Sequence, residues 1–103
     1  MVREEFATGG CFERLNAWLD SNMVRFGFFR PYATDRGGVQ PEPWHLSFAP
    51  VAREFEARLS PRLLRDAIEA ADIELKPVIL EDLDIIFARY VGSARCIPSG
   101  DAR

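Results

Sequence analysis

Residues 33–43 limit the possible folds of this chain more than any other stretch, because residues that favour turns crowd it. Asp35, Gly37, Gly38, Pro41 and Pro43 fall within eleven positions. Glycine and proline at this density interrupt both helices and strands. We therefore predict a loop here, with a short extended segment on each side of it.

The segments beside this loop differ in pattern. Apolar residues recur at helical spacing in residues 11–22, which predicts a first helix. Residues 26–32 are aromatic and read as an extended segment that ends near Pro31. Residues 44–48 alternate and predict a strand, with positions 44, 46 and 48 on a buried face and His45 and Ser47 on the opposite one.

Three further helices are expected after the second strand. Pro50 suits a first helical position, Ser60 followed by Pro61 predicts a capped start, and Pro77 opens the last helix. The expected fold class is α+β, with a small antiparallel sheet packed with about four helices. We expect residues 1–91 to form a single domain and residues 92–103 a flexible tail.

Composition excludes several classes of function. The net charge is −3, and the basic residues are mixed with acids rather than clustered, so no nucleic-acid partner is expected. No apolar run is long enough to span a membrane, and the polar start is unlike a signal peptide. The chain as given is therefore expected to be cytoplasmic, or in the periplasm or cell envelope if a longer precursor exists. Cys11 and Cys96 are expected to be free thiols, one buried on a helix and one in the tail.

A Glu-Pro-Trp-His tetrad at residues 42–45 carries the strongest chemical signal. His45 is the only histidine of the chain, and Glu42 precedes it by three residues. In a zinc site, an imidazole can hold the metal while a neighbouring carboxylate takes a proton from the attacking water. The spacing alone is common, so a structural or merely exposed histidine is the competing interpretation. A catalytic zinc usually takes three protein ligands.

A family resemblance adds to this pattern. It rests on Phe-Gly-Phe-Phe-Arg-Pro-Tyr at residues 26–32, Arg-Gly-Gly-Val at 36–39, Glu-Pro-Trp-His-Leu-Ser-Phe at 42–48, Trp-Leu at 18–19, Leu-Glu-Asp-Leu-Asp at 80–84 and Ala-Arg-Tyr-Val at 88–91. Over most of residues 11–91, these stretches resemble the carboxy-terminal motif block of the zinc D-alanyl-D-alanine carboxypeptidases, the VanY-like peptidases. The resemblance implies part of that metallopeptidase fold.

The resemblance also implies a reaction and its residues. Glu42 would be the general base, His45 a zinc ligand, and the substrate a peptidoglycan stem peptide ending in D-Ala-D-Ala. The family's other two zinc ligands come from a His-x-x-Gly-x-Ala-x-Asp motif, which this sequence lacks. We therefore interpret the chain as the carboxy-terminal half of such a peptidase, incomplete and inactive alone.

Three further residues are candidates for substrate contact. Arg30 and Arg36 would meet a substrate carboxylate, and Trp44 would line the cleft. The competing interpretation makes the two arginines surface residues or partners of Asp35. Two alternative functions remain: a non-catalytic module that binds cell-wall peptides, and an oligomerising module in which a second copy covers apolar surface, as in a homodimer.

Overall fold

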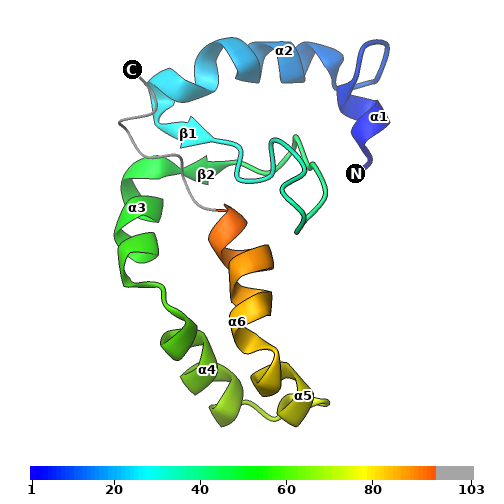
Figure 1. Cartoon of the computed structure of the whole chain (residues 1–103). Coiled ribbons are helices and arrows are strands. Elements are labelled where there is room, and N and C mark those ends of the chain that lie inside the picture. Colours follow the sequence, from blue (N-terminus) through cyan, green and yellow to red (C-terminus); the bar gives the residue numbers. More distant parts are fainter. Residues whose placement is uncertain (95–103) are drawn as a thin grey trace.

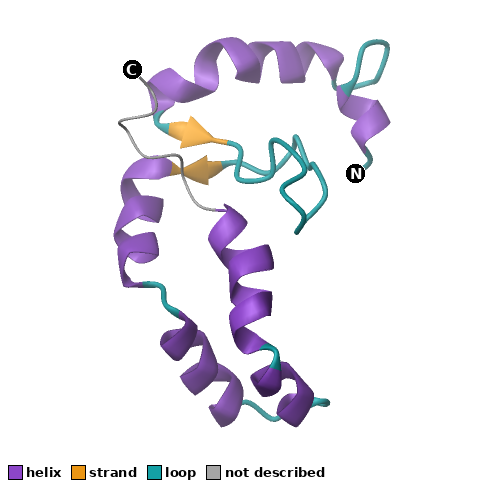
Figure 2. Cartoon of the chain, in the orientation of Figure 1, coloured by secondary structure: helices purple, strands orange, loops and turns teal. Residues whose placement is uncertain are grey.

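A two-stranded antiparallel sheet and a series of helices make up the part of the chain that the computed structural model describes, residues 1–94. The first part contains α1 (Arg3–Phe6), α2 (Glu13–Asn22) and a 3₁₀ turn, η1 (Met23–Phe26). The sheet pairs β1 (Phe28–Phe29) with β2 (Ser47–Phe48), in a register that places Phe28 opposite Phe48. Figure 2 shows the long loop that connects these two strands.

The second part of the chain is helical throughout. It contains α3 (Ala49–Arg58), α4 (Pro61–Ala70), α5 (Lys76–Glu81) and α6 (Leu83–Ile86). A π-helical segment, η2 (Phe87–Val91), and a 3₁₀ turn, η3 (Gly92–Ala94), extend α6. Figure 1 shows that α3 and α4 lead away from the sheet, α5 turns the chain, and α6 returns towards the loop. The expected α+β class with a small antiparallel sheet is confirmed.

Local sequence signals explain where several helices begin. The Ser60 hydroxyl accepts a hydrogen bond from the Leu63 amide at 3.1 Å, so it caps α4 as expected. Proline also occupies the first turn of α3 and of α5. The first long helix, however, begins at Glu13 rather than at residue 11. The thiol of Cys11 therefore lies before the helix and is exposed, not buried as expected.

The buried core is very small. Among residues 1–94, only Phe6, Leu83 and Phe87 are buried apolar residues. Phe6 packs its ring against Phe12, with the centroids 5.2 Å apart, and against Trp44 at 5.8 Å. Leu83 and Phe87 lie on the last helical segment, where α6 contacts α4 and α5. The amino-terminal turn α1, which the sequence pattern did not predict, thus supplies one of the three core residues.

The predicted strand over residues 44–48 is wrong for most of its length. Only residues 47–48 are extended in the sheet, and residues 43–44 form a turn. Leu46 and Phe48, expected on a buried face, are 37% and 41% exposed. A two-stranded sheet has no second layer of its own, so these side chains stay partly open to solvent. The last predicted helix is likewise interrupted at Asp82, and Tyr90 on its expected inner face is 44% exposed.

The expected tail lies almost entirely outside the described residues. Gly92–Ala94 form the 3₁₀ turn η3, and the positions that follow, including Cys96, are not described. The division into a domain of residues 1–91 and a tail therefore stays a prediction. None of the helices in residues 1–94 is long and apolar enough to cross a membrane.

Candidate functional site

A tight turn brings the two candidate catalytic side chains together. The His45 amide donates to the Glu42 carbonyl at 3.2 Å, which closes a β-turn with Pro43 and Trp44 at its centre. Proline suits the first central position of such a turn because its φ is already fixed near the required value. Within this turn, Nδ1 of His45 lies 2.5 Å from Oε2 of Glu42.

This pair lies at the surface of the protein. The His45 side chain is 53% exposed and that of Glu42 is 28% exposed. A carboxylate that accepts from Nδ1 fixes the orientation of an imidazole and its tautomer, leaving Nε2 as the ring nitrogen for another partner. The expected neighbourhood of Glu42 and His45 is therefore present. The turn holds both residues, whereas His45 was predicted to lie on one face of a strand.

Aromatic rings support the pair on two sides. Tyr32 meets the His45 ring edge-on at a centroid distance of 5.6 Å, and its carbonyl accepts from the Glu42 amide at 2.9 Å. Trp44, a predicted substrate contact, is half-buried between Phe6 at 5.8 Å and His45 at 6.1 Å. Its indole thus connects the small core to the surface turn.

Arg30 is already occupied by protein groups. Its Nε donates to the Pro43 carbonyl at 2.8 Å, and its two terminal nitrogens reach Asn16 at 2.7 Å and Asp20 at 2.5 Å. The side chain is only 9% exposed. These bonds join α2 to the turn that carries the Glu42–His45 pair. These bonds suit a positioning role for Arg30, and its ion pair is with Asp20 rather than Asp35. The predicted contact with substrate stays a prediction.

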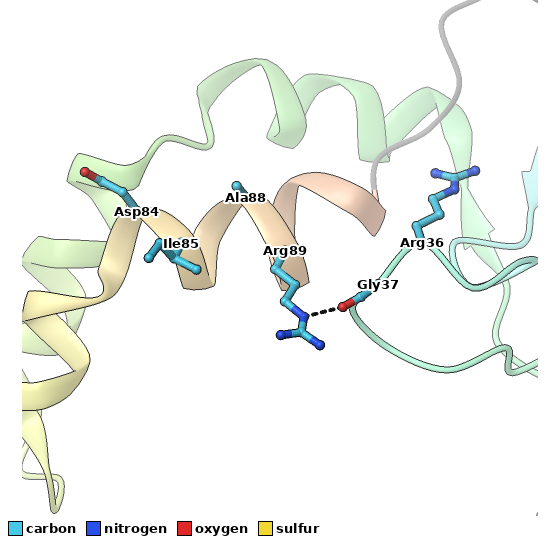
Figure 3. A pocket seen from close by; sticks show the side chains of 6 residues that line it. All are labelled: Arg36, Gly37, Asp84, Ile85, Ala88 and Arg89. Carbon is cyan, nitrogen blue, oxygen red and sulfur yellow. Dashed lines mark hydrogen bonds between the residues drawn. The ribbon is translucent and has the colours of Figure 1, made fainter.

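Arg36 lies in a different place, where the loop meets the last helical segment. It donates to the Ser93 carbonyl at 2.8 Å. Figure 3 shows it at the edge of a shallow, open pocket of about 730 Å³ that is also lined by Gly37, Asp84, Ile85, Ala88 and Arg89. Arg89 reaches across this pocket to donate to the Gly37 carbonyl. Arg36 thus joins the loop to η3, in a place separate from the Glu42–His45 pair.

Asp35 orders the loop next to Arg36. Its carboxylate accepts from the Gly37 amide at 2.8 Å and from the Gln40 amide group at 3.2 Å. These hydrogen bonds, the Gly37 one foremost, lower the pKa of Asp35, and the positive charges of Arg89 and Arg3 act in the same direction. Asp35 is therefore a loop-forming residue, as its type suggests.

A second, smaller pocket adjoins the imidazole through Tyr32. It has a volume of about 290 Å³ and is lined by Tyr32, Glu56, Leu59, Tyr90, Val91 and Ala94. Tyr32 lines this pocket and also meets the His45 ring, so one side chain connects the pocket with the candidate pair. Its largely apolar wall with one carboxylate suits a small peptide side chain.

The donor set does not fit a catalytic zinc. Within residues 1–94, no group of three or more histidine, cysteine, aspartate or glutamate side chains is placed to hold a metal ion. The whole sequence contains one histidine. The turn supplies an imidazole and one carboxylate, and these are bonded to each other. Three protein ligands with an open position, which a catalytic zinc needs, are not provided by the described residues.

Comparison with known proteins places the turn in a family context. The VanY model, described as D-alanyl-D-alanine carboxypeptidase, matches residues 2–51 and so includes Glu42 and His45. A D-alanyl-D-alanine carboxypeptidase of Enterococcus faecalis is 50% identical over 34 residues, which span 30% of this chain and 13% of that protein. The first half of the chain is thus similar to D-alanyl-D-alanine carboxypeptidases. No solved structure matches the chain.

An uncharacterized protein of Haemophilus influenzae matches more of the length. It is 30% identical over 89 residues, covering 84% of this chain and 68% of that protein. The chain therefore belongs to one family with this Haemophilus protein, and its residues 2–51 match the VanY model. That match ends at residue 51, so it does not extend to the resemblance noted in residues 80–91.

Sequence reasoning missed three residues that shape the site. Phe6 supports Trp44, Asn16 and Asp20 hold Arg30, and all three precede the loop in the chain. Asn16 and Asp20 are four residues apart and so lie on one face of α2, which is a signal that could have predicted a shared partner. The choice of Arg30 as that partner depends on tertiary structure.

Proposed function

We propose that this chain is a D-alanyl-D-alanine carboxypeptidase-like protein that carries the Glu/His part of a peptidase site and does not hydrolyse peptides by itself. The observation that carries this proposal is the 2.5 Å contact between Glu42 and His45 inside the segment that the VanY model matches. In this proposal the chain corresponds to the carboxy-terminal half of the peptidase fold.

The two residues have distinct roles in the proposal. Glu42 is the carboxylate that takes a proton when a peptide bond is attacked, and His45 supplies an imidazole nitrogen. Because Glu42 holds Nδ1, the imidazole has Nε2 left for a further partner. The described residues supply no complete zinc site, so we assign no catalytic step to a metal here. This shortage of ligands is the reason for proposing inactivity.

The proposed ligand is a peptidoglycan peptide that ends in D-Ala-D-Ala. The 290 Å³ pocket beside Tyr32 would accept a small side chain, and Trp44 would line its approach. Arg36 would meet a carboxylate only if the ligand reaches the separate pocket near Arg89. Arg30 supports the turn from behind and contributes no direct contact to the ligand.

A hydrolysis and zinc-binding experiment tests this proposal. With zinc added, we expect no release of D-alanine from a peptide that ends in D-Ala-D-Ala. By calorimetry, we expect no zinc binding that is lost when His45 is replaced. His45→Ala and Glu42→Gln are the test variants, and Glu69→Gln on α4, away from the turn, is the control. Hydrolysis by the wild type that Glu42→Gln abolishes would show that the site is complete and refute the inactivity.

A non-catalytic binding module is the second candidate. Its supporting observation is that Glu42 and His45 are hydrogen-bonded to each other, while the pocket lined by Tyr32 could bind a peptide without a metal ion. In this case a D-Ala-D-Ala-ended peptide would bind in the presence of a chelator, and Trp44→Ala would weaken the binding. If the peptide binds neither with zinc nor with chelator, both candidate functions are wrong.

A further inference from the structure

Two arginines fasten the loop between the strands to the last helical segment. Arg36 of the loop donates a hydrogen bond to the Ser93 carbonyl at 2.8 Å, and Arg89 of η2 donates to the Gly37 carbonyl. Figure 3 shows the second of these bonds crossing from the helix to the loop. Each side of the junction thus supplies one donor, and the partners lie 57 and 52 residues apart in the chain.

The backbones also meet closely at this junction. A Cβ on Gly38 would collide with the Arg89 carbonyl, so glycine allows the loop to approach η2 this closely. The Ser93 hydroxyl donates to the same carbonyl at 2.5 Å. Within η2, the Gly92 amide donates to the Phe87 carbonyl, five residues earlier. Such π-helical turns are rare in proteins but frequent at functional sites.

Hydrogen bonds within the loop connect this junction to the turn that follows. The Asp35 carboxylate accepts from the Gly37 amide at 2.8 Å and from the Gln40 side chain at 3.2 Å. The Glu42 amide donates to the Tyr32 carbonyl at 2.9 Å, which closes the base of the loop. A loop that is bonded to itself in this way is restrained as a whole when one part of it is fastened.

The last helical segment faces the base of the loop as well. Tyr32 lines the 290 Å³ pocket together with Tyr90 and Val91 of η2 and Ala94 of η3. The ring of Tyr32 also meets the His45 ring edge-on, with the centroids 5.6 Å apart. One side chain at the loop base therefore lies between the last helical segment and the imidazole of the candidate pair.

We propose that Arg36 and Arg89 are positioning residues for the Glu42–His45 pair, which they orient by fixing the loop that leads into its turn. This gives residues 87–94 a part in the site, although the VanY match ends at residue 51. The proposal rests on the geometry of the pair and not on the reaction proposed for it. Either proposal can therefore fail while the other holds.

NMR of the whole chain, without peptide or zinc, tests the proposal on Arg36→Ala and Arg89→Ala. In both variants we expect the chemical shifts of the His45 ring to move. We also expect the Gly37 and Glu42 amides to exchange about threefold to tenfold faster, because the loop loses one hydrogen bond from a charged donor. Arg89→Lys keeps a charged donor and should return the His45 shifts towards those of the wild type.

Arg65→Ala is the matched control. Arg65 also donates to a distant carbonyl, that of Leu80 at 3.3 Å, but this bond joins α4 to α5 rather than the loop to η2. Its loss should leave the His45 ring shifts unchanged. A loss of stability alone changes the unfolded fraction and not the chemical shifts of the folded form, so shifts separate positioning from a purely structural role.

Two outcomes would overturn the proposal. One is that the His45 shifts and the loop exchange rates of both arginine-to-alanine variants equal those of the wild type. The other is that Arg65→Ala moves the His45 shifts as far as they do, which would show a general effect of losing an arginine. If Arg89→Ala fails to fold by circular dichroism, Arg36→Ala decides, because Arg36 is an exposed loop residue.

Discussion

Replacement of Arg30 by alanine should destabilise the protein and release the Glu42–His45 turn from α2. The side chain is 9% exposed and makes hydrogen bonds to Pro43, Asn16 and Asp20. The hydrogen bonds to Pro43 and Asn16 have a charged donor and contribute about 1.5 kcal/mol each, and the contact with Asp20 is counted as an ion pair. The ion pair adds at most about 1 kcal/mol, because Asp20 is 58% exposed. The expected loss is about 3 to 4 kcal/mol in the free energy of unfolding.

Urea denaturation followed by circular dichroism measures this loss. Asp20→Asn is the matched control. It removes only the exposed ion pair and should cost at most about 1 kcal/mol. A second readout is the His45 ring in an NMR spectrum, whose chemical shifts should change in Arg30→Ala and much less in Asp20→Asn.

The reasoning fails if Arg30→Ala unfolds at the same urea concentration as the wild type. Unchanged His45 shifts in a destabilised Arg30→Ala protein would refute the positioning role alone. In that case the arginine would hold the fold without orienting the turn. Arg30→Lys separates charge from geometry, since lysine keeps the charge but cannot reach three acceptors with a planar fork.

Three other predictions concern the core and the loop. Leu83→Ala should cost about 3 to 5 kcal/mol in denaturant unfolding, because Leu83 is fully buried; a loss under 1 kcal/mol would contradict its place in the core. Gly38→Ala should separate the loop from the last helical segment, because the added Cβ would collide with the Arg89 carbonyl. Amide hydrogen exchange near Gly38 should then become faster in this variant, and slower exchange would contradict the prediction. The lowered pKa of Asp35 means that its loop contribution is present near neutral pH and is lost as pH falls through that pKa. NMR titration should therefore show the Gly37 amide signal constant above about pH 5 and moving only in acid, whereas Asp35→Asn should abolish this movement.

Local chemistry made part of this fold predictable. The Ser60–Pro61 start of α4 and the loop at residues 33–43 follow from short-range rules, and the structure confirms them. Of the extended segments predicted on the two sides of the loop, only Phe28–Phe29 and Ser47–Phe48 are strands. The same rules pointed to the proximity of Glu42 and His45, because three residues across a proline turn keep two side chains close. Pro43 by itself favours a β-turn, but the alternating pattern of residues 44–48 led to the prediction of a strand instead.

Burial could not be predicted in the same way. Alternation at residues 44–48 marks which side chains share a face, and it does not say whether another element covers that face. Leu46 and Phe48 are exposed because only two strands form and no second layer lies against them within the described residues. Arg30 shows the opposite case, where a charged residue predicted to face a ligand is enclosed by α2 and the turn.

The sequence by itself therefore determined the positions of the loop and of the capped helix starts, as well as the closeness of Glu42 and His45, since each depends on neighbours along the chain. Tertiary structure alone decided that Phe6 supports Trp44, that Arg30 joins α2 to the turn, and that Leu46 and Phe48 stay partly exposed. These outcomes depend on which distant segments meet. Short-range patterns carry no information about that choice, because the free energy of burial comes from the partner surface as much as from the residue itself.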